Sequence, residues 1–174
     1  MKPFTLPAPA LRRFLVVAVA LYLVWFFVYE QWLAPDGRLD AFLCEYIARS
    51  SAAALHLLGF DAAVLYPRIV FMQGQAAVIV GAPCNGLVLY MLFAGFIVAF
   101  SGPWQHKLVY IPLGIVLISL LNVIRVMALA LNYQYSRATL EFNHHYTFTF
   151  VVYGCIFLLW MWWARRYSPA PTAA

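Results

Sequence analysis

The chain has 174 residues, of which 66% are hydrophobic and 10% are charged, and its formal net charge is +5. Soluble domains have about 25% charged residues, so this composition excludes an ordinary soluble protein and predicts one integral membrane domain over residues 1–174. The basic residues stand mostly at the ends of apolar segments and form no stripe, which excludes a nucleic-acid-binding surface.

The first apolar segment, residues 11–32, is long enough to cross a lipid bilayer. Lys2, Arg12 and Arg13 stand at its start, as in a secretory signal peptide, but the segment is too long and lacks a small-residue cleavage site. We therefore predict a retained membrane anchor. The turn-forming residues 33–40 predict a loop after it.

Residues 41–60 have apolar positions at helical spacing, interrupted by Glu45, Arg49 and His56. A full span would bury two charges at high cost, whereas an interfacial or re-entrant helix keeps them in water, and we favour the latter. Whether this segment crosses the membrane stays open at this point. Glu45 and Arg49 are four residues apart in the favourable order, which predicts a local surface ion pair.

Residues 61–81 have the pattern of extended chain. Two β-prone runs around the turn Gln73-Gly74-Gln75 predict a short β-hairpin, in which Pro67 restricts the first strand to an edge. The edge groups of a hairpin would be unsatisfied in hydrocarbon. We therefore expect the hairpin on the water side, within an extracytoplasmic segment, residues 33–83.

Three more apolar segments predict membrane helices at about residues 84–101, 108–131 and 145–163. The polar tail after them, from residue 168, is expected to be disordered. The predicted fold class is an all-α integral membrane protein with about four transmembrane helices, an interfacial or re-entrant helix and a short extracytoplasmic β-hairpin.

The charges orient these helices. With four spans, six basic residues lie on the cytoplasmic side and all six acidic residues lie outside or at the outer boundary. A five-span arrangement would instead place Lys107, Arg165 and Arg166 outside, against the positive-inside tendency. The sequence thus predicts a multi-pass protein of the cell (inner or cytoplasmic) membrane, with both termini in the cytoplasm.

A turn-rich segment, Gly81-Ala-Pro-Cys-Asn-Gly86, precedes the second predicted span. Pro83 is typical of a first helical turn, so we expect the helix to open on Cys84. Unpaired N–H groups and the positive end of the helix dipole favour the thiolate form of a cysteine there, which would make it a nucleophile. The alternative is a small apolar thiol that only packs.

Three residues are predicted to lie at one depth. Counting from the cytoplasmic ends, Cys84 is 17 residues above Ser101, and Arg125 is 17 residues above Leu108. His145 is 18 residues above Trp163. At about 1.5 Å per residue, all three rise roughly 25–27 Å and stand just below the outer edge of the hydrocarbon core.

Arg125 needs a partner, because a charged residue within a span usually faces the interior of the bundle, and a Cys84 thiolate would supply one. Asn122 lies three residues earlier on the same helical face and could orient either group. Arg125 could alternatively snorkel to the outer headgroups, and His144 and His145 could be interfacial histidines. Together, however, Cys84, Arg125 and a histidine suffice for acyl transfer at the outer membrane boundary.

The motifs Pro83-Cys84-Asn85-Gly86 and Asn122-Val-Ile-Arg125, with a histidine opening the last span, resemble the exosortase/archaeosortase family. That family consists of polytopic membrane cysteine transpeptidases, which process a C-terminal sorting signal made of a short motif such as Pro-Glu-Pro, a transmembrane helix and a basic tail. The resemblance implies Cys84, Arg125 and His145 as catalytic residues, with His144 as the alternate histidine. His145 is preferred because its nine-residue spacing to Gly154 fits the family pattern better.

The resemblance covers roughly residues 78–163, and the chain looks like a compact member that lacks several N-terminal helices. Asn122, Asn85 and Gly86 are the expected supporting residues. The implied partners are an exported protein with a sorting signal, the lipid bilayer, and an amine acceptor or small membrane partner.

Two other functions are consistent with the same residues. Water could resolve the thioester, which would make the protein a protease. A non-enzymatic assembly factor or small transporter could use Arg125 and the histidines as a polar site. No cofactor and no metal are expected, because the three cysteines have no metal-ligand spacing and adjacent histidines on a helix diverge by about 100°.

Overall fold

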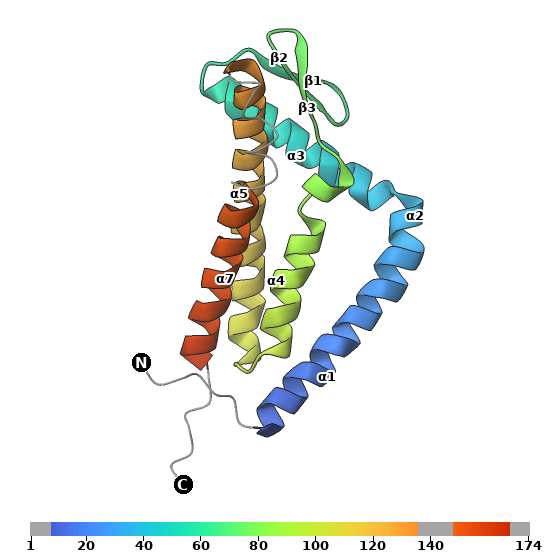
Figure 1. Ribbon diagram of the computed structural model, residues 1–174, viewed down its shortest axis with the longest axis vertical. Helices are drawn as coiled ribbons and strands as arrows, with labels where there is room; N and C mark the ends of the chain where they lie inside the picture. Colours follow the sequence, from blue (N-terminus) through green and yellow to red (C-terminus); the bar gives the residue numbers. More distant parts are fainter. Residues whose placement is uncertain (1–7, 136–147, 168–174) are drawn as a thin grey trace.

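The computed structural model describes residues 8–135 and 148–167. Helices α4, α5 and α7 form a bundle, and α1 packs beside one end of α4 (Figure 1). Helix α3 and a three-stranded sheet form a head at the other end of α5 (Figure 1). Buried apolar side chains form one core in the head and a second core in the bundle.

The N-terminal rod is helical for longer than predicted. Helix α1 (Ala8–Trp25) continues into the π-helical segment η1 (Phe26–Leu33) and then into α2 (Ala34–Asp36). The predicted loop at residues 33–40 is wrong, because only Gly37, with φ +69°, interrupts the helices before α3 begins. Pro35 lies in α2, and the rod ends two residues after it, at Gly37.

Helix α3 (Arg38–Leu57) is amphipathic, and one face is buried against α5 and the sheet. The buried residues recur every three or four positions; they are Asp40, Cys44, Ile47, Ala48, Ser51, Ala52 and Leu55. Ser51 Oγ donates a hydrogen bond to the carbonyl of Ile47 (2.7 Å), and its small side chain lets α5 approach closely. On the other face, the predicted ion pair is confirmed, with Arg49 Nη2 2.5 Å from Glu45 Oε1.

The extended segment folds as an antiparallel sheet of three strands, β1 (Ala62–Tyr66), β2 (Ile69–Met72) and β3 (Gln75–Ile79), in the order β1-β2-β3. The β2–β3 turn uses the positive φ values of Gln73 (+49°) and Gly74 (+76°). One face of β2 is buried against α3 and α5. The strands therefore form part of the head, and the chain leaves β3 in the direction of Cys84.

The bundle consists of α4 (Leu87–Ala99), α5 (Trp104–Tyr135) and α7 (Phe148–Tyr167). Helices α4 and α5 are in close contact where Gly114 faces the buried ring of Phe93, and a Cβ at Gly114 would overlap that ring. At the far end, Trp163 Nε1 donates to the carbonyl of Ser101 (3.1 Å), which ties α7 to the α4–α5 connection.

Lys107 caps the C-terminal end of α4. It is buried, and its ammonium donates to the carbonyls of Val98 (2.9 Å) and Phe100 (2.6 Å). A cation at a helix C-terminus is stabilised by the helix dipole and satisfies carbonyls that have no intrahelical partner. The two carbonyls thus accommodate the buried ammonium of Lys107.

Two helices in the described part of the chain are long and apolar enough to cross a membrane: Pro9–Asp36, with 28 residues, and Trp104–Tyr135, with 32. Helix α4 is apolar but shorter, with 13 residues. The described residues are therefore mostly helical, as the sequence predicted, and two of the helices are suited to cross a membrane.

Candidate active site

Cys84 lies on the short linker between the sheet and α4. Pro83 lies within a single 3₁₀ turn, Ala82–Cys84, instead of opening the membrane helix itself, and α4 begins three residues after Cys84, at Leu87. The reason is Gly86, whose φ of +84° interrupts the helix; a Cβ there would also lie 2.7 Å from the hydroxyl oxygen of Tyr90. The half-buried Cys84 side chain is therefore held by a tight turn just above the helix.

Helix α5 brings both of its predicted site residues to this turn. Arg125 Nη2 lies 3.6 Å from Cys84 Sγ, and Asn122 Nδ2 donates to the carbonyl oxygen of Cys84 at 2.7 Å. Asn122 and Arg125 are three residues apart, so they share one face of the helix. Asn122 holds the backbone of the cysteine, while the guanidinium contacts its sulfur.

The buried oxygen of Asn122 offers a further hydrogen-bonding position. Asn122 is 1% exposed, and its Oδ1 has no hydrogen-bond donor among the described residues. A buried amide oxygen without a donor costs free energy, so it would accept a hydrogen bond from a group that enters the site.

A second set of hydrogen bonds supports the turn from the other side. Asn85 Nδ2 donates to Asp40 Oδ1, and Asn85 Oδ1 accepts from the backbone N–H of Leu87 (2.9 Å). The Tyr29 hydroxyl donates to the same carboxylate, at 3.0 Å from Oδ2. Asn85 and Asp40 are both buried, so these bonds link η1, α3 and the cysteine turn.

The sequence pattern predicts neither Asp40 nor Tyr29 as a site residue. Asp40 falls in the loop expected at residues 33–40, whereas it lies in the first turn of α3 and begins the buried face of that helix. One signal was available: Asp40 and Cys44 are four residues apart, at the spacing of the buried positions that follow. A lone acidic residue on that face requires a buried partner.

The other two cysteines occupy different surroundings. Cys44 is 1% exposed on α3, and burial raises the pKa of its thiol, partly offset by the charge of Arg68. It is therefore a neutral packing residue of the head core. Cys155 lies on α7, in the bundle.

The predicted histidines, His144 and His145, lie outside the described residues, and α7 begins at Phe148. Arg125 and Cys84 are in contact, so these two predicted site residues lie at one level of the molecule. Their depth in the membrane stays a prediction. At the opposite end of the bundle, Trp163 donates a hydrogen bond to the carbonyl of Ser101, so these two residues also lie at one level. Within the described ranges, no cluster of three His, Cys, Asp or Glu residues suited to a metal ion occurs.

A family model described as transmembrane exosortase matches residues 5–162 of the chain. The match includes all the site residues described above and both histidines. Comparison with curated proteins and with solved structures gave no match.

Proposed function

We propose that this chain, which belongs to the transmembrane exosortase family, is a membrane-embedded cysteine transpeptidase or protease. It would cleave the C-terminal sorting signal of exported proteins through a thioester on Cys84. The observation that carries the proposal is the 3.6 Å contact between Arg125 Nη2 and Cys84 Sγ, because a guanidinium beside a thiol stabilises the thiolate that attacks.

The proposed chemistry has two steps. In the first, the Cys84 thiolate attacks the scissile peptide carbonyl, a C–S bond forms, the C–N bond breaks, and His145 delivers a proton to the leaving amine. In the second, an amine acceptor or water attacks the thioester, its proton passes to His145, and Cys84 leaves as thiolate. Arg125 would stabilise the thiolate and the tetrahedral oxyanion.

Supporting residues hold this geometry in the proposal. Asn122 fixes the Cys84 carbonyl and offers its buried oxygen to the substrate. Asn85 fixes the backbone that follows the nucleophile, and Gly86 permits the tight turn. The substrate partner would be an exported protein whose own transmembrane segment lies beside the bundle in the bilayer.

The proposed topology has four spans, with both termini in the cytoplasm of the cell and the site at the extracytoplasmic face. The 13 residues of α4 rise only about 20 Å, but the linker carrying Cys84 completes the crossing. Helix α3 and the sheet would rest at the outer surface as one domain with the bundle. The two long apolar helices and the transmembrane family support this arrangement.

A processing assay tests the proposal. A protein with a Pro-Glu-Pro-type sorting signal is co-expressed with wild type, Cys84→Ala, Arg125→Ala and the matched control Cys155→Ala. We expect cleavage with wild type and Cys155→Ala and none with the other two. If Cys84→Ala cleaves and Arg125→Ala does not, the nucleophile assignment is wrong. The mass of the product with and without an added amine separates transpeptidation from hydrolysis.

A further inference from the structure

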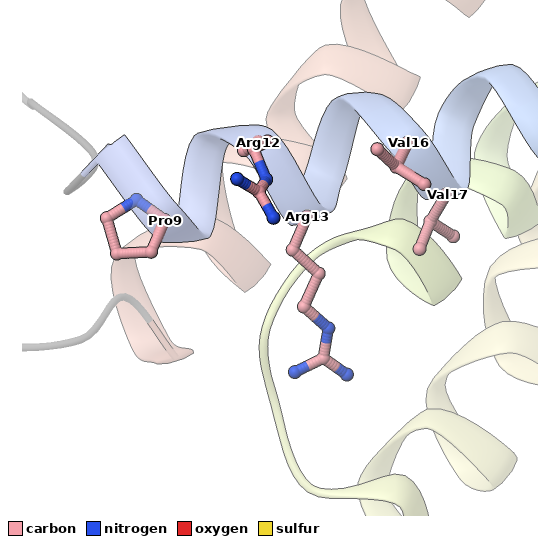
Figure 2. Close-up of a pocket in the computed structure, with 5 residues that line it drawn as sticks. All are labelled: Pro9, Arg12, Arg13, Val16 and Val17. Atoms are coloured by element: carbon pink, nitrogen blue, oxygen red, sulfur yellow. The ribbon is translucent and has the colours of Figure 1, made fainter.

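A groove lies on α1 at the end of the molecule opposite the head. It is an open surface feature lined by residues of that helix alone, Pro9, Arg12, Arg13, Val16 and Val17. In Figure 2, the two arginines lie between Pro9 and the two valines along α1. The lining thus combines two guanidinium groups with an apolar wall.

The surroundings of the groove are strongly cationic. Arg13 extends toward the connection between α4 and α5 (Figure 2), and its charge acts electrostatically on the buried ammonium of Lys107. In the described ranges, every acidic residue lies between Glu30 and Asp61, in the stretch that leads into and forms the head. Two neighbouring cations without a nearby carboxylate in that part of the chain favour an anionic ligand.

The apolar wall indicates which kind of anion fits. Val16 is 62% exposed and continues into an apolar strip on the outside of α1, which includes Val19 (58% exposed). Inorganic phosphate would use the arginines alone. A phosphodiester with an acyl chain would use the arginines and the valines together.

We propose that this groove binds one anionic phospholipid of the cytoplasmic leaflet. The Arg12 and Arg13 guanidinium groups hold the phosphate oxygens, a pairing for which the planar guanidinium is suited, and the first carbons of an acyl chain lie along Val16 and Val17. The inference uses the membrane orientation proposed above and is independent of the cysteine chemistry.

The test uses the full-length protein, purified and delipidated in neutral detergent, with phosphatidylglycerol, phosphatidylcholine or inorganic phosphate added. Native mass spectrometry measures the bound ligand and its dissociation constant. We expect one phosphatidylglycerol per chain, with no comparable retention of phosphatidylcholine or phosphate. The double variant Arg12→Gln/Arg13→Gln should raise the dissociation constant about 30-fold, at about 1 kcal/mol per basic residue.

The charge-matched control is Arg165→Gln/Arg166→Gln, an exposed basic pair in the last turn of α7. It should retain the lipid. Equal losses in the two double variants would overturn the proposal in favour of general surface charge, and equal binding of inorganic phosphate would make the groove a phosphate site only. Cys84→Ala should bind the lipid as wild type does, so a failure of the catalytic proposal would leave this result unchanged.

Discussion

At the scale of single residues, the candidate site depends on polar groups that arrive from three parts of the chain. Asn122 and Arg125 come from α5, Asp40 comes from α3, and Tyr29 comes from η1. Asn122 and Arg125 contact Cys84, Asp40 accepts from the neighbouring Asn85, and Tyr29 donates to Asp40. The turn that carries the cysteine is therefore fixed on both sides.

Removing the Arg125 charge should slow the reaction of Cys84 with a thiol reagent. A charge-assisted hydrogen bond contributes about 1.5 kcal/mol, so we expect alkylation of Cys84 in Arg125→Gln to be about tenfold slower than in wild type. Labelling with iodoacetamide followed by peptide mass spectrometry measures the rate. Cys155 in the same samples is the internal control, and an unchanged Cys84 rate would show that the contact does not stabilise the thiolate.

Asp40 acts on the site by positioning Asn85. In Asp40→Asn, the Asn85 amide and the Tyr29 hydroxyl compete for one oxygen, and an unsatisfied buried donor costs about 1–3 kcal/mol. We expect the maximal processing rate in lipid nanodiscs to fall about tenfold, with the KM for the substrate nearly unchanged.

The control for Asp40 is Glu45→Gln, which removes the same charge from the same helix. Its exposed pair with Arg49 contributes little, so the rate should stay within about twofold of wild type. Equal rates in the two variants would argue against a positioning role for Asp40. Partial recovery in Asp40→Glu would strengthen it.

At the scale of the elements, the length of the apolar segments was sufficient to predict the long helices, and the apolar periodicity of residues 41–60 was sufficient to predict a helix there. Neither pattern was sufficient to predict where the helices end. The start of α4 is determined by the positive φ of Gly86, and the loop expected at residues 33–40 contracts to Gly37. Such ends depend on tertiary contacts, as with the ring of Tyr90 beside Gly86, and a one-dimensional pattern does not contain them.

The α4–α5 packing should tolerate no added methyl group at Gly114. Gly114→Ala would press a Cβ into the buried ring of Phe93 and should destabilise the protein by about 1–3 kcal/mol in detergent unfolding. Gly154→Ala is the matched control, because a Cβ at Gly154 on α7 would have no atom within 4 Å among the described residues. Similar stability of the two variants would contradict the close α4–α5 contact.

At the scale of the whole molecule, the described acidic residues are confined to the stretch leading into and forming the head. Described basic residues lie at both ends: Arg38, Arg49 and Arg68 in the head, and Arg12, Arg13, Lys107, Arg165 and Arg166 at the opposite end. Counting residues along the predicted helices was sufficient to place Cys84 and Arg125 at one level, because a helix rises by a constant amount per residue. It could not predict that Asp40 and Tyr29 lie beside the cysteine turn, because their positions depend on how α3 crosses the head.

Reporter fusions test the four-span arrangement. Alkaline phosphatase, which is active only outside the cytoplasm, should be active when inserted at Gly74, in the β2–β3 turn. It should be inactive at Gly102, between α4 and α5, and at the C-terminus. Activity at Gly102 would instead support five spans, since α3 would then cross the membrane.

The most direct test of the central claim is detection of an acyl group on Cys84. Cells that make the sorting-signal substrate together with wild type or His145→Ala are quenched in acid, and the Cys84 peptide is analysed by mass spectrometry before and after hydroxylamine. We predict a hydroxylamine-labile adduct on Cys84 in wild type, less of it in His145→Ala because the leaving amine then lacks its proton donor, and no processing by Cys84→Ala. Normal processing by Cys84→Ala would contradict the claim.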